Sequence, residues 1–173
     1  PKPQNPICIE NSNLNNGLST GDEAHTALPQ DHRLEFDLGT IIMLDLSNKN
    51  IQGGIGSLGE CFNLKQLDLS HNRITMLSGI DTLTKMRVCD LSHNKLTTVD
   101  AIKPCNGLER LDLQGNMIKD LKALERIGAF LTNLAVLYLQ DFDANNQNPV
   151  CSNKAYRATI LNSFGRNLKA LDG

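Results

Sequence analysis

The segment Leu64-x-x-Leu67-x-Leu69-x-x-Asn72-x-Ile74 sets a pattern of apolar positions followed by one asparagine. It returns 22 residues later as Met86-x-x-Cys89-x-Leu91-x-x-Asn94-x-Leu96, and after another 22 residues as Leu108-x-x-Leu111-x-Leu113-x-x-Asn116-x-Ile118. Poorer copies begin at Ile41, 23 residues before the first, and at Leu134, 26 residues after the last. A period of nearly constant length predicts similar structural units stacked one on another.

Each unit combines a strand with a return limb. Leu67 and Leu69 alternate with polar residues, as in a strand with one buried face. Asn72 then offers an amide to the backbone groups of a turn, and apolar residues return at roughly helical spacing from Ile74 to Leu83. We therefore predict an α/β fold, a right-handed leucine-rich repeat solenoid of about five repeats plus a C-terminal cap. Its parallel β-sheet lies on the concave face, and helical or 3₁₀ segments form the convex side.

This fold requires one interior ladder, and its members are the equivalent apolar residues Leu44, Leu67, Cys89, Leu111 and Leu137. We divide the chain into a polar N-terminal arm (1–32), the repeats (33–140), and an inserted loop with the C-terminal cap (141–173). The alternation of Leu34, Phe36 and Leu38 predicts a strand over the N-terminal end. Four glycines after Ile51 predict an irregular or short 3₁₀ return limb in the first copy.

The last repeat departs from the pattern in two ways. Its turn asparagine should stand at position 142, but the first candidate is Asn148, six residues later, so residues 141–147 form an inserted loop. Ser152 is predicted as the N-cap of a closing helix that contains Ile160 and Phe164.

Composition limits the classes of function. A net charge of −2 gives no basic footprint for direct nucleic-acid binding, and no apolar run approaches the roughly 20 residues of a membrane span. The five cysteines are scattered; Cys89 and Cys105 stand at apolar repeat positions and are predicted to be small buried groups. Without paired cysteine caps or an Asn-x-Ser/Thr site, we expect a cytoplasmic protein.

The 22-residue period, with Asn148-Pro-Val, Tyr156-Arg and Leu168-x-x-Leu-Asp-Gly173, resembles the intracellular leucine-rich repeats typified by the regulatory subunit of protein phosphatase 1. The ending resembles the cap shared with the spliceosomal A-prime protein, acidic nuclear phosphoproteins and the axonemal dynein light chain. The cap with its acidic insert is most similar to leucine-rich proteins of centrosomes, basal bodies and cilia. Such proteins often continue into coiled coil, so we expect a longer protein in which sequence outside this chain provides any self-association.

Candidate binding residues follow from the strand alternation, because residues between the apolar positions point to the concave face. Asp45, Asp68, Asp90 and Asp112 occupy one column, and with strands roughly 4.8 Å apart these carboxylates repel unless a cation approaches. Tyr138 ends the column as a potential interface anchor. The remaining candidates on the face are Lys65, Arg87, Arg110, His71 and His93, and those in the loop are Asp141, Phe142 and Asp143.

Each candidate also has a purely structural interpretation. Leu-Asp-Leu-Ser is a common default in such repeats, so the aspartates can be solvated, and Tyr138 can fold onto the inserted loop. Phe142 can plug the core as readily as contact a partner. Zinc at His71 and His93 lacks the three or four ligands that a stable site needs. Acid–base catalysis by His71, His93, Asp68 and Asp90 lacks a nucleophile and an enclosed pocket. We expect neither metal nor cofactor.

The sequence thus predicts a non-catalytic scaffold or adaptor that binds another protein through the concave face. The acidic column favours a basic helix or extended segment as the partner. The resemblance implies an assembly of the microtubule cytoskeleton, centrosome, basal body or cilium. Two alternatives stay open: a regulatory subunit of protein phosphatase 1, and a nuclear ribonucleoprotein component.

Overall fold

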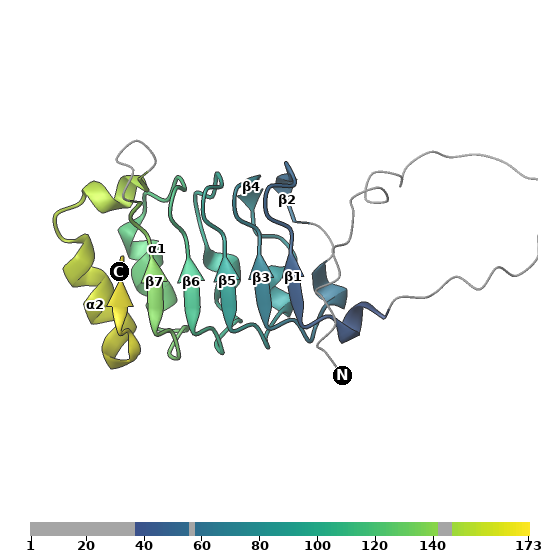
Figure 1. The fold of residues 1–173 in the computed structure, drawn as a ribbon. Coiled ribbons are helices and arrows are strands. Elements are labelled where there is room, and N and C mark those ends of the chain that lie inside the picture. Colours follow the sequence, from purple (N-terminus) through teal and green to yellow (C-terminus); the bar gives the residue numbers. More distant parts are fainter. Residues whose placement is uncertain (1–36, 56–57, 142–146) are drawn as a thin grey trace, which may run out of the picture.

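The structure, a computed structural model, describes residues 37–55, 58–141 and 147–173. Their strands and return limbs alternate along the chain, and successive turns lie side by side (Figure 1). The main sheet is six-stranded, entirely parallel and ordered as in the chain. Its strands are β1 (Met43–Asp45), β3 (Gln66–Asp68), β5 (Val88–Asp90), β6 (Arg110–Asp112), β7 (Val136–Tyr138) and β8 (Ala170–Leu171).

The interior ladder is confirmed. Pairing aligns the five predicted residues across neighbouring strands, in the order Leu44, Leu67, Cys89, Leu111 and Leu137. None of them is more than 5% exposed, and all belong to one continuous apolar core. No single turn encloses this core, so each turn is stabilised by burial against its neighbours.

The return limbs are shorter and less helical than the apolar spacing suggests. In the first two repeats they begin with strands β2 (Gln52–Gly54) and β4 (Arg73–Met76), which pair in a second, two-stranded parallel sheet. The limbs then contain single 3₁₀ turns, at Leu58–Glu60, Ile80–Thr82 and Asp100–Ile102. The 3₁₀ segment expected in the first repeat is confirmed, whereas β2 was not predicted.

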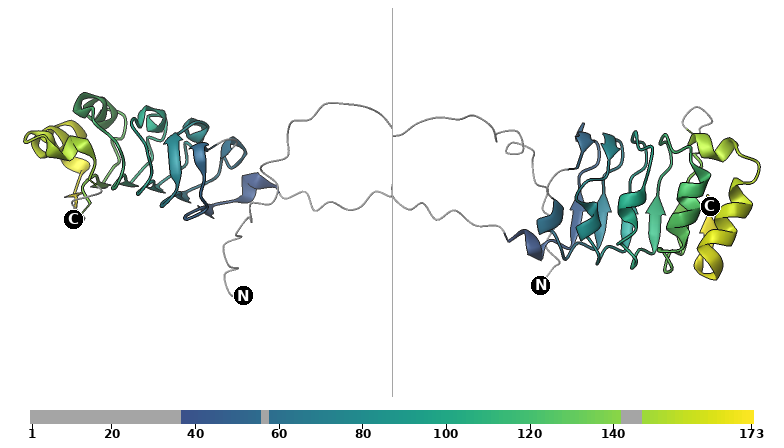
Figure 2. Two further views of the ribbon diagram at one scale, coloured as in Figure 1. Left: turned by 90° about the horizontal axis from the view of Figure 1, so that it is seen from above. Right: turned by 180° about the vertical axis from the view of Figure 1, so that it is seen from behind.

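The fourth repeat has an α-helix, α1 (Leu121–Gly128), where the three preceding limbs have 3₁₀ turns. This repeat is longer than its predecessors by three or four residues, about one turn of α-helix. The Asp120 side chain caps the helix by accepting the Lys122 N–H at 2.9 Å, and Leu, Ala, Glu and Arg favour the helical state. Seen from behind, α1 and the 3₁₀ segments cover the side of the coil opposite the sheet (Figure 2).

Turn asparagines join the repeats beyond the strands. Asn72, Asn94 and Asn116 are buried, and each amide nitrogen donates to main-chain oxygens of its own repeat and of the preceding one. Each side-chain oxygen accepts a main-chain N–H from the preceding repeat. Asn148 does the same: it accepts the Ile118 N–H at 3.0 Å and donates to the oxygens of Leu113 and Leu139. The late asparagine therefore fills the expected turn position.

The C-terminal end consists of a 3₁₀ segment (Pro149–Ser152), helix α2 (Tyr156–Phe164), a second 3₁₀ segment (Gly165–Asn167) and β8. The prediction that Ser152 caps the helix is wrong, because Ser152 ends the 3₁₀ segment and α2 begins four residues later. Asn153 accepts the Ala155 N–H at 2.9 Å and so closes the turn between the two segments. Leu171 of the closing Leu168-x-x-Leu-Asp-Gly173 motif pairs with Leu137, so the last strand continues the interior ladder.

At the N-terminal end the predicted strand is wrong where it is described. Leu38 begins a 3₁₀ turn (Leu38–Thr40), and Asp37 caps that turn by accepting the Gly39 N–H at 2.9 Å. Leu34, Phe36 and the rest of the arm lie outside the described residues. Within the described ranges, every helix is too short or too polar to span a bilayer.

Candidate binding face of the sheet

The candidate face is the surface of the six-stranded sheet that points away from the interior ladder, called here the sheet face. Strand register places Asp45, Asp68, Asp90 and Asp112 side by side on it, followed by Tyr138. Burial increases along this column: Asp45 is exposed, the next two aspartates are partly buried, and Asp112 is only 7% exposed. The predicted column therefore exists, but its members meet solvent to different extents.

Each aspartate of the column has a structural role. One oxygen of its carboxylate accepts the main-chain N–H two residues ahead, and the receiving pairs are Asp45–Ser47, Asp68–Ser70, Asp90–Ser92 and Asp112–Gln114, at 2.9–3.1 Å. Such a bond stabilises the turn that follows the strand. This local bond is enough to explain why aspartate recurs at this position, even if no partner protein binds there. For Asp68 and Asp112 the other oxygen has no hydrogen-bond donor among the described residues.

Electrostatics distinguish Asp112 from the rest. Burial, opposed by the Gln114 N–H and reinforced by the charges of Asp90 and Asp141, raises the pKa of the Asp112 carboxyl to about 6. The Ser47 main-chain N–H lowers the pKa of Asp45. Arg110 lowers the pKa of Asp112, but it offsets only part of the increase caused by burial, Asp90 and Asp141.

Arg110 and Tyr138 form the most interface-like feature of the face. The Arg110 guanidinium lies over the Tyr138 ring, 5.0 Å from its centre, in cation–π geometry. Val88 and Val136 flank Arg110 in the strand register, and both are partly exposed. Aromatic and arginine side chains among aliphatic neighbours are typical of interface anchors. The two valines were not predicted as site residues, although the alternation that points Arg110 outward applies to them equally.

The other basic candidates lie elsewhere on the face. Arg87 forms an ion pair with Glu109 of the next repeat, and both side chains are at least half exposed. Such a surface pair is worth little in stability. Lys65 is exposed and lines a separate cleft at the N-terminal end of the coil.

His71, His93 and Gly115 occupy equivalent positions in successive repeats, called here the histidine column, and they share one backbone conformation. His71 and His93 have φ angles of 54° and 53°, in the left-handed region, and Gly115 takes the same conformation one strand further. The two imidazoles stack with ring centres 4.4 Å apart. A Cβ at Gly115 would stand 2.6 Å from Nδ1 of His93, so glycine leaves room for the ring. The residue types at these three positions are therefore explained by the conformation and packing of the turns.

The inserted loop is described only in part. Asp141 Oδ2 lies 3.7 Å from Nε2 of His93, which connects the loop to the histidine column. The predicted contacts of Phe142 and Asp143 lie outside the described residues. No group of three or more metal-ligating side chains occurs within the described ranges.

The four cysteines of the described residues are buried or partly buried. Cys61, Cys89 and Cys105 are buried and Cys151 is partly buried; none of these four is in a disulfide. Burial raises the pKa of the Cys105 and Cys151 thiols to about 11, which disfavours the reactive thiolate. Cys89 and Cys105 therefore behave as the small core groups that the repeat pattern predicts.

Two polar networks were not foreseen. Asn63, Asn133 and Asn167 each precede the first leucine of a repeat and donate to a carbonyl of the preceding turn. At the C-terminal end, Asp172 accepts the Leu139 and Gln140 N–H groups through Oδ1 and contacts Tyr156 and Arg157 through Oδ2. The first network could have been predicted, because an asparagine recurs directly before the first leucine in three places in the sequence. The second joins residues from two elements, which spacing does not reveal.

Comparison with known proteins agrees with this geometry. The family model described as leucine rich repeat matches residues 62–118, the region of the three best motif copies. The chain is a leucine-rich repeat solenoid. The comparison with curated proteins gives no match.

Solved structures resemble this solenoid over about three quarters of its length. Internalin C2 of Listeria monocytogenes is 34% identical with a TM-score of 0.60, over 78% of this chain and 52% of that one. Internalin F of the same organism, 21% identical with a TM-score of 0.59 over 77% of this chain and 35% of that one, shows the fold alone. The Drosophila melanogaster SNF/U2A′ complex is 26% identical with a TM-score of 0.63, over 75% of this chain and 71% of that one. The solenoid thus spans about half of internalin C2 and a third of internalin F.

Proposed function

We propose that this solenoid is a non-catalytic scaffold or adaptor that holds a segment of a partner protein across the sheet face. Leucine-rich repeat domains generally mediate protein–protein interaction, and the matches indicate no enzyme family. The observation that carries the proposal is the Arg110–Tyr138 pair between Val88 and Val136. It provides an aromatic and cationic anchor on β6 and β7 of the sheet face.

The acidic column defines the chemistry of the partner segment. Asp68 and Asp90 are partly exposed, lie in register, and retain negative charge beyond their turn bonds. Burial raises the pKa of Asp112 and the charges of Asp90 and Asp141 reinforce this, so a cation placed nearby favours the charged form of this carboxyl. We therefore propose a basic helix or a basic extended segment as the occupant, with an apolar group placed against Val88 and Val136.

For the cellular setting, we propose a cytoplasmic assembly of the microtubule cytoskeleton, centrosome, basal body or cilium. The support is the likeness of the Asn148-Pro-Val…Leu-Asp-Gly173 ending, with its acidic insert, to proteins of those structures. A second setting, a nuclear ribonucleoprotein, is favoured by the structural match to the SNF/U2A′ complex, in which a similar solenoid has a protein partner. Fluorescence imaging of the tagged protein in ciliated cells separates them: centrosomal or ciliary foci support the first setting, and nuclear speckles the second.

A quantitative pull-down from ciliated cells tests the sheet face. The bait is compared with a triple variant, Asp68→Asn/Asp90→Asn/Tyr138→Ala. Asparagine still accepts the Ser70 and Ser92 N–H groups, so the substitutions remove charge without removing the turn bonds. We expect a specific set of proteins to be recovered at least about tenfold less, as when an anchor and two charges are lost.

The matched control is Asp81→Asn/Glu125→Asn/Phe130→Ala, which removes two exposed charges and an exposed ring away from the sheet face. Both variants must keep the wild-type circular dichroism spectrum. Equal recovery of every protein by wild type and the sheet-face variant would remove this face from the function of the protein.

A further inference from the structure

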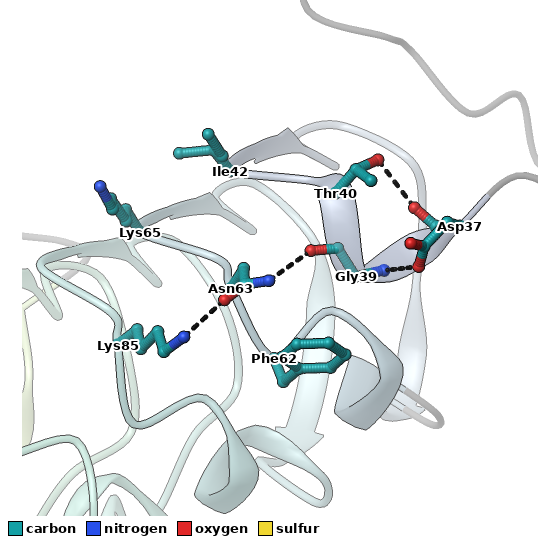
Figure 3. A pocket seen from close by; sticks show the side chains of 8 residues that line it. All are labelled: Asp37, Gly39, Thr40, Ile42, Phe62, Asn63, Lys65 and Lys85. Atoms are coloured by element: carbon teal, nitrogen blue, oxygen red, sulfur yellow. Dashed lines mark hydrogen bonds between the residues drawn. The ribbon is translucent and has the colours of Figure 1, made fainter.

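A second surface feature lies at the N-terminal end of the coil, apart from the acidic column. It is an open cleft of about 450 Å³, called here the basic cleft, and its lining residues are Asp37, Gly39, Thr40, Ile42, Phe62, Asn63, Lys65 and Lys85. They come from three successive turns: the 3₁₀ segment before β1, the approach to β3 and the approach to β5 (Figure 3). The cleft therefore exists only because these turns stack.

The cleft combines apolar surface with basic charge. Ile42 is 51% exposed and Phe62 is 53% exposed, so the cleft lining includes two large apolar side chains that meet solvent. Lys65 and Lys85 supply two ammonium groups, and neither forms an ion pair with a carboxylate of the described residues. Elsewhere on the sheet face, by contrast, Arg87 pairs with Glu109.

Hydrogen bonds hold the cleft in shape. The Asn63 amide donates to the Gly39 carbonyl at 2.7 Å, and its oxygen accepts from Lys85 Nζ at 2.6 Å, so Asn63 lies between the two (Figure 3). An ammonium group has three donors, and this bond uses one of those on Lys85. The Phe62 ring packs against Gly39, where even an added Cβ would lie 2.7 Å from the ring. The one carboxylate in the lining, Asp37, caps the Gly39 N–H.

We propose that the basic cleft binds an acidic segment of a partner protein. One apolar side chain of that segment packs against Ile42 and Phe62, and its carboxylates meet Lys65 and Lys85. Charge complementarity identifies the occupant: the cleft has two cations and one carboxylate, whereas the neighbouring column is acidic. The proposal extends the protein-binding role proposed above and rests on it, and it gives the bound segment a direction: acidic at β1, basic toward β6.

The test uses a defined probe. The ¹⁵N-labelled chain is titrated with the peptide acetyl-Gly-Glu-Glu-Leu-Glu-Glu-Gly-amide and followed by two-dimensional NMR. We expect amide shifts around Ile42, Asn63 and Lys85, and weaker binding by peptides in which leucine is replaced by serine or glutamate by lysine. Lys65→Ser/Lys85→Ser should weaken the binding about three- to tenfold, the loss expected for two exposed charge contacts.

Lys95→Ser/Lys122→Ser is the control, because it removes two exposed charges elsewhere and should leave the affinity within about twofold. Absence of shifts at the cleft, or an equal loss in both lysine variants, would overturn the proposal. The sheet-face triple variant should bind the acidic peptide at least as well as wild type. A failed pull-down combined with normal peptide shifts would thus reject the sheet face alone, and the converse would reject the cleft alone.

Discussion

At the scale of single residues, one carboxylate of this protein both stabilises a turn and is a buried ionisable group. Asp112 accepts the Gln114 N–H at 3.1 Å yet is 7% exposed, and burial raises its pKa from 3.8 to about 6. The folded state therefore holds the Asp112 proton more tightly than the unfolded chain does. The stability that this group contributes is fully present below pH 4 and is lost as the pH rises through 6.

Asp112→Asn should therefore stabilise the protein at neutral pH. Asparagine keeps an acceptor for Gln114 and has no charge to bury, so the free energy of unfolding at pH 7 should rise by about 1–3 kcal/mol. At pH 4 the two proteins should differ by less than about 0.5 kcal/mol, since the wild-type carboxyl is then largely protonated. Urea denaturation at both pH values measures the difference. A gain of equal size at pH 4 would show that charge burial is not its cause.

Two glycines with left-handed backbone conformation allow a second residue-scale test. Gly53 and Gly115 both have positive φ, but an added Cβ meets no atom within 4 Å at Gly53 and lies 2.6 Å from His93 Nδ1 at Gly115. Gly53→Ala should cost about 1–2 kcal/mol from backbone strain alone. Gly115→Ala should cost at least about 1 kcal/mol more, because the His93 ring must move out of its stack. Equal costs by thermal denaturation would contradict a steric role for Gly115.

At the scale of elements, repeat spacing predicted the strands well and the return limbs less well. Strand register follows from one apolar ladder, because each copy of the motif places an apolar residue at the same position of its strand. Leu44 to Leu137 align as expected. Return limbs depend on how many residues are left between turns, so the longer fourth repeat has α1 while shorter ones have 3₁₀ turns. Alternation placed the acidic column correctly, but not the burial of Asp112, which depends on its neighbours in space.

The asparagine turns are the element-scale feature with the clearest energetic consequence. In Asn148→Ala the Ile118 N–H loses its acceptor, and the carbonyls of Leu113 and Leu139 lose a donor. We expect a loss of about 2–4 kcal/mol, because these groups remain buried. Asn133→Ala removes one exposed bond, to the Asn106 carbonyl, and should cost less than about 1 kcal/mol. Similar midpoints for both variants in urea would mean that Asn148 is not a turn asparagine of the same kind.

At the scale of the whole molecule, stability should vary along the coil. β5 and β6 have neighbouring strands on both sides, whereas β1 pairs with β3 alone within the described residues. The C-terminal end is held differently: helix α2 packs on α1, and Asp172 ties Tyr156 and Arg157 to the last turn. In a linear array each repeat is stabilised by its neighbours, so damage at one end should spread only a short distance.

Asp172→Ala tests how far this coupling extends. The substitution leaves the Leu139 and Gln140 N–H groups without their acceptor and removes the partner of Arg157. Native-state hydrogen exchange should show opening free energies about 1–3 kcal/mol lower for amides of β7 and α2. Amides of β3, four strands away in the sheet, should change by less than about 0.5 kcal/mol, because only neighbouring turns share contacts. A uniform decrease from β3 to α2 would instead show that the solenoid unfolds as one cooperative unit.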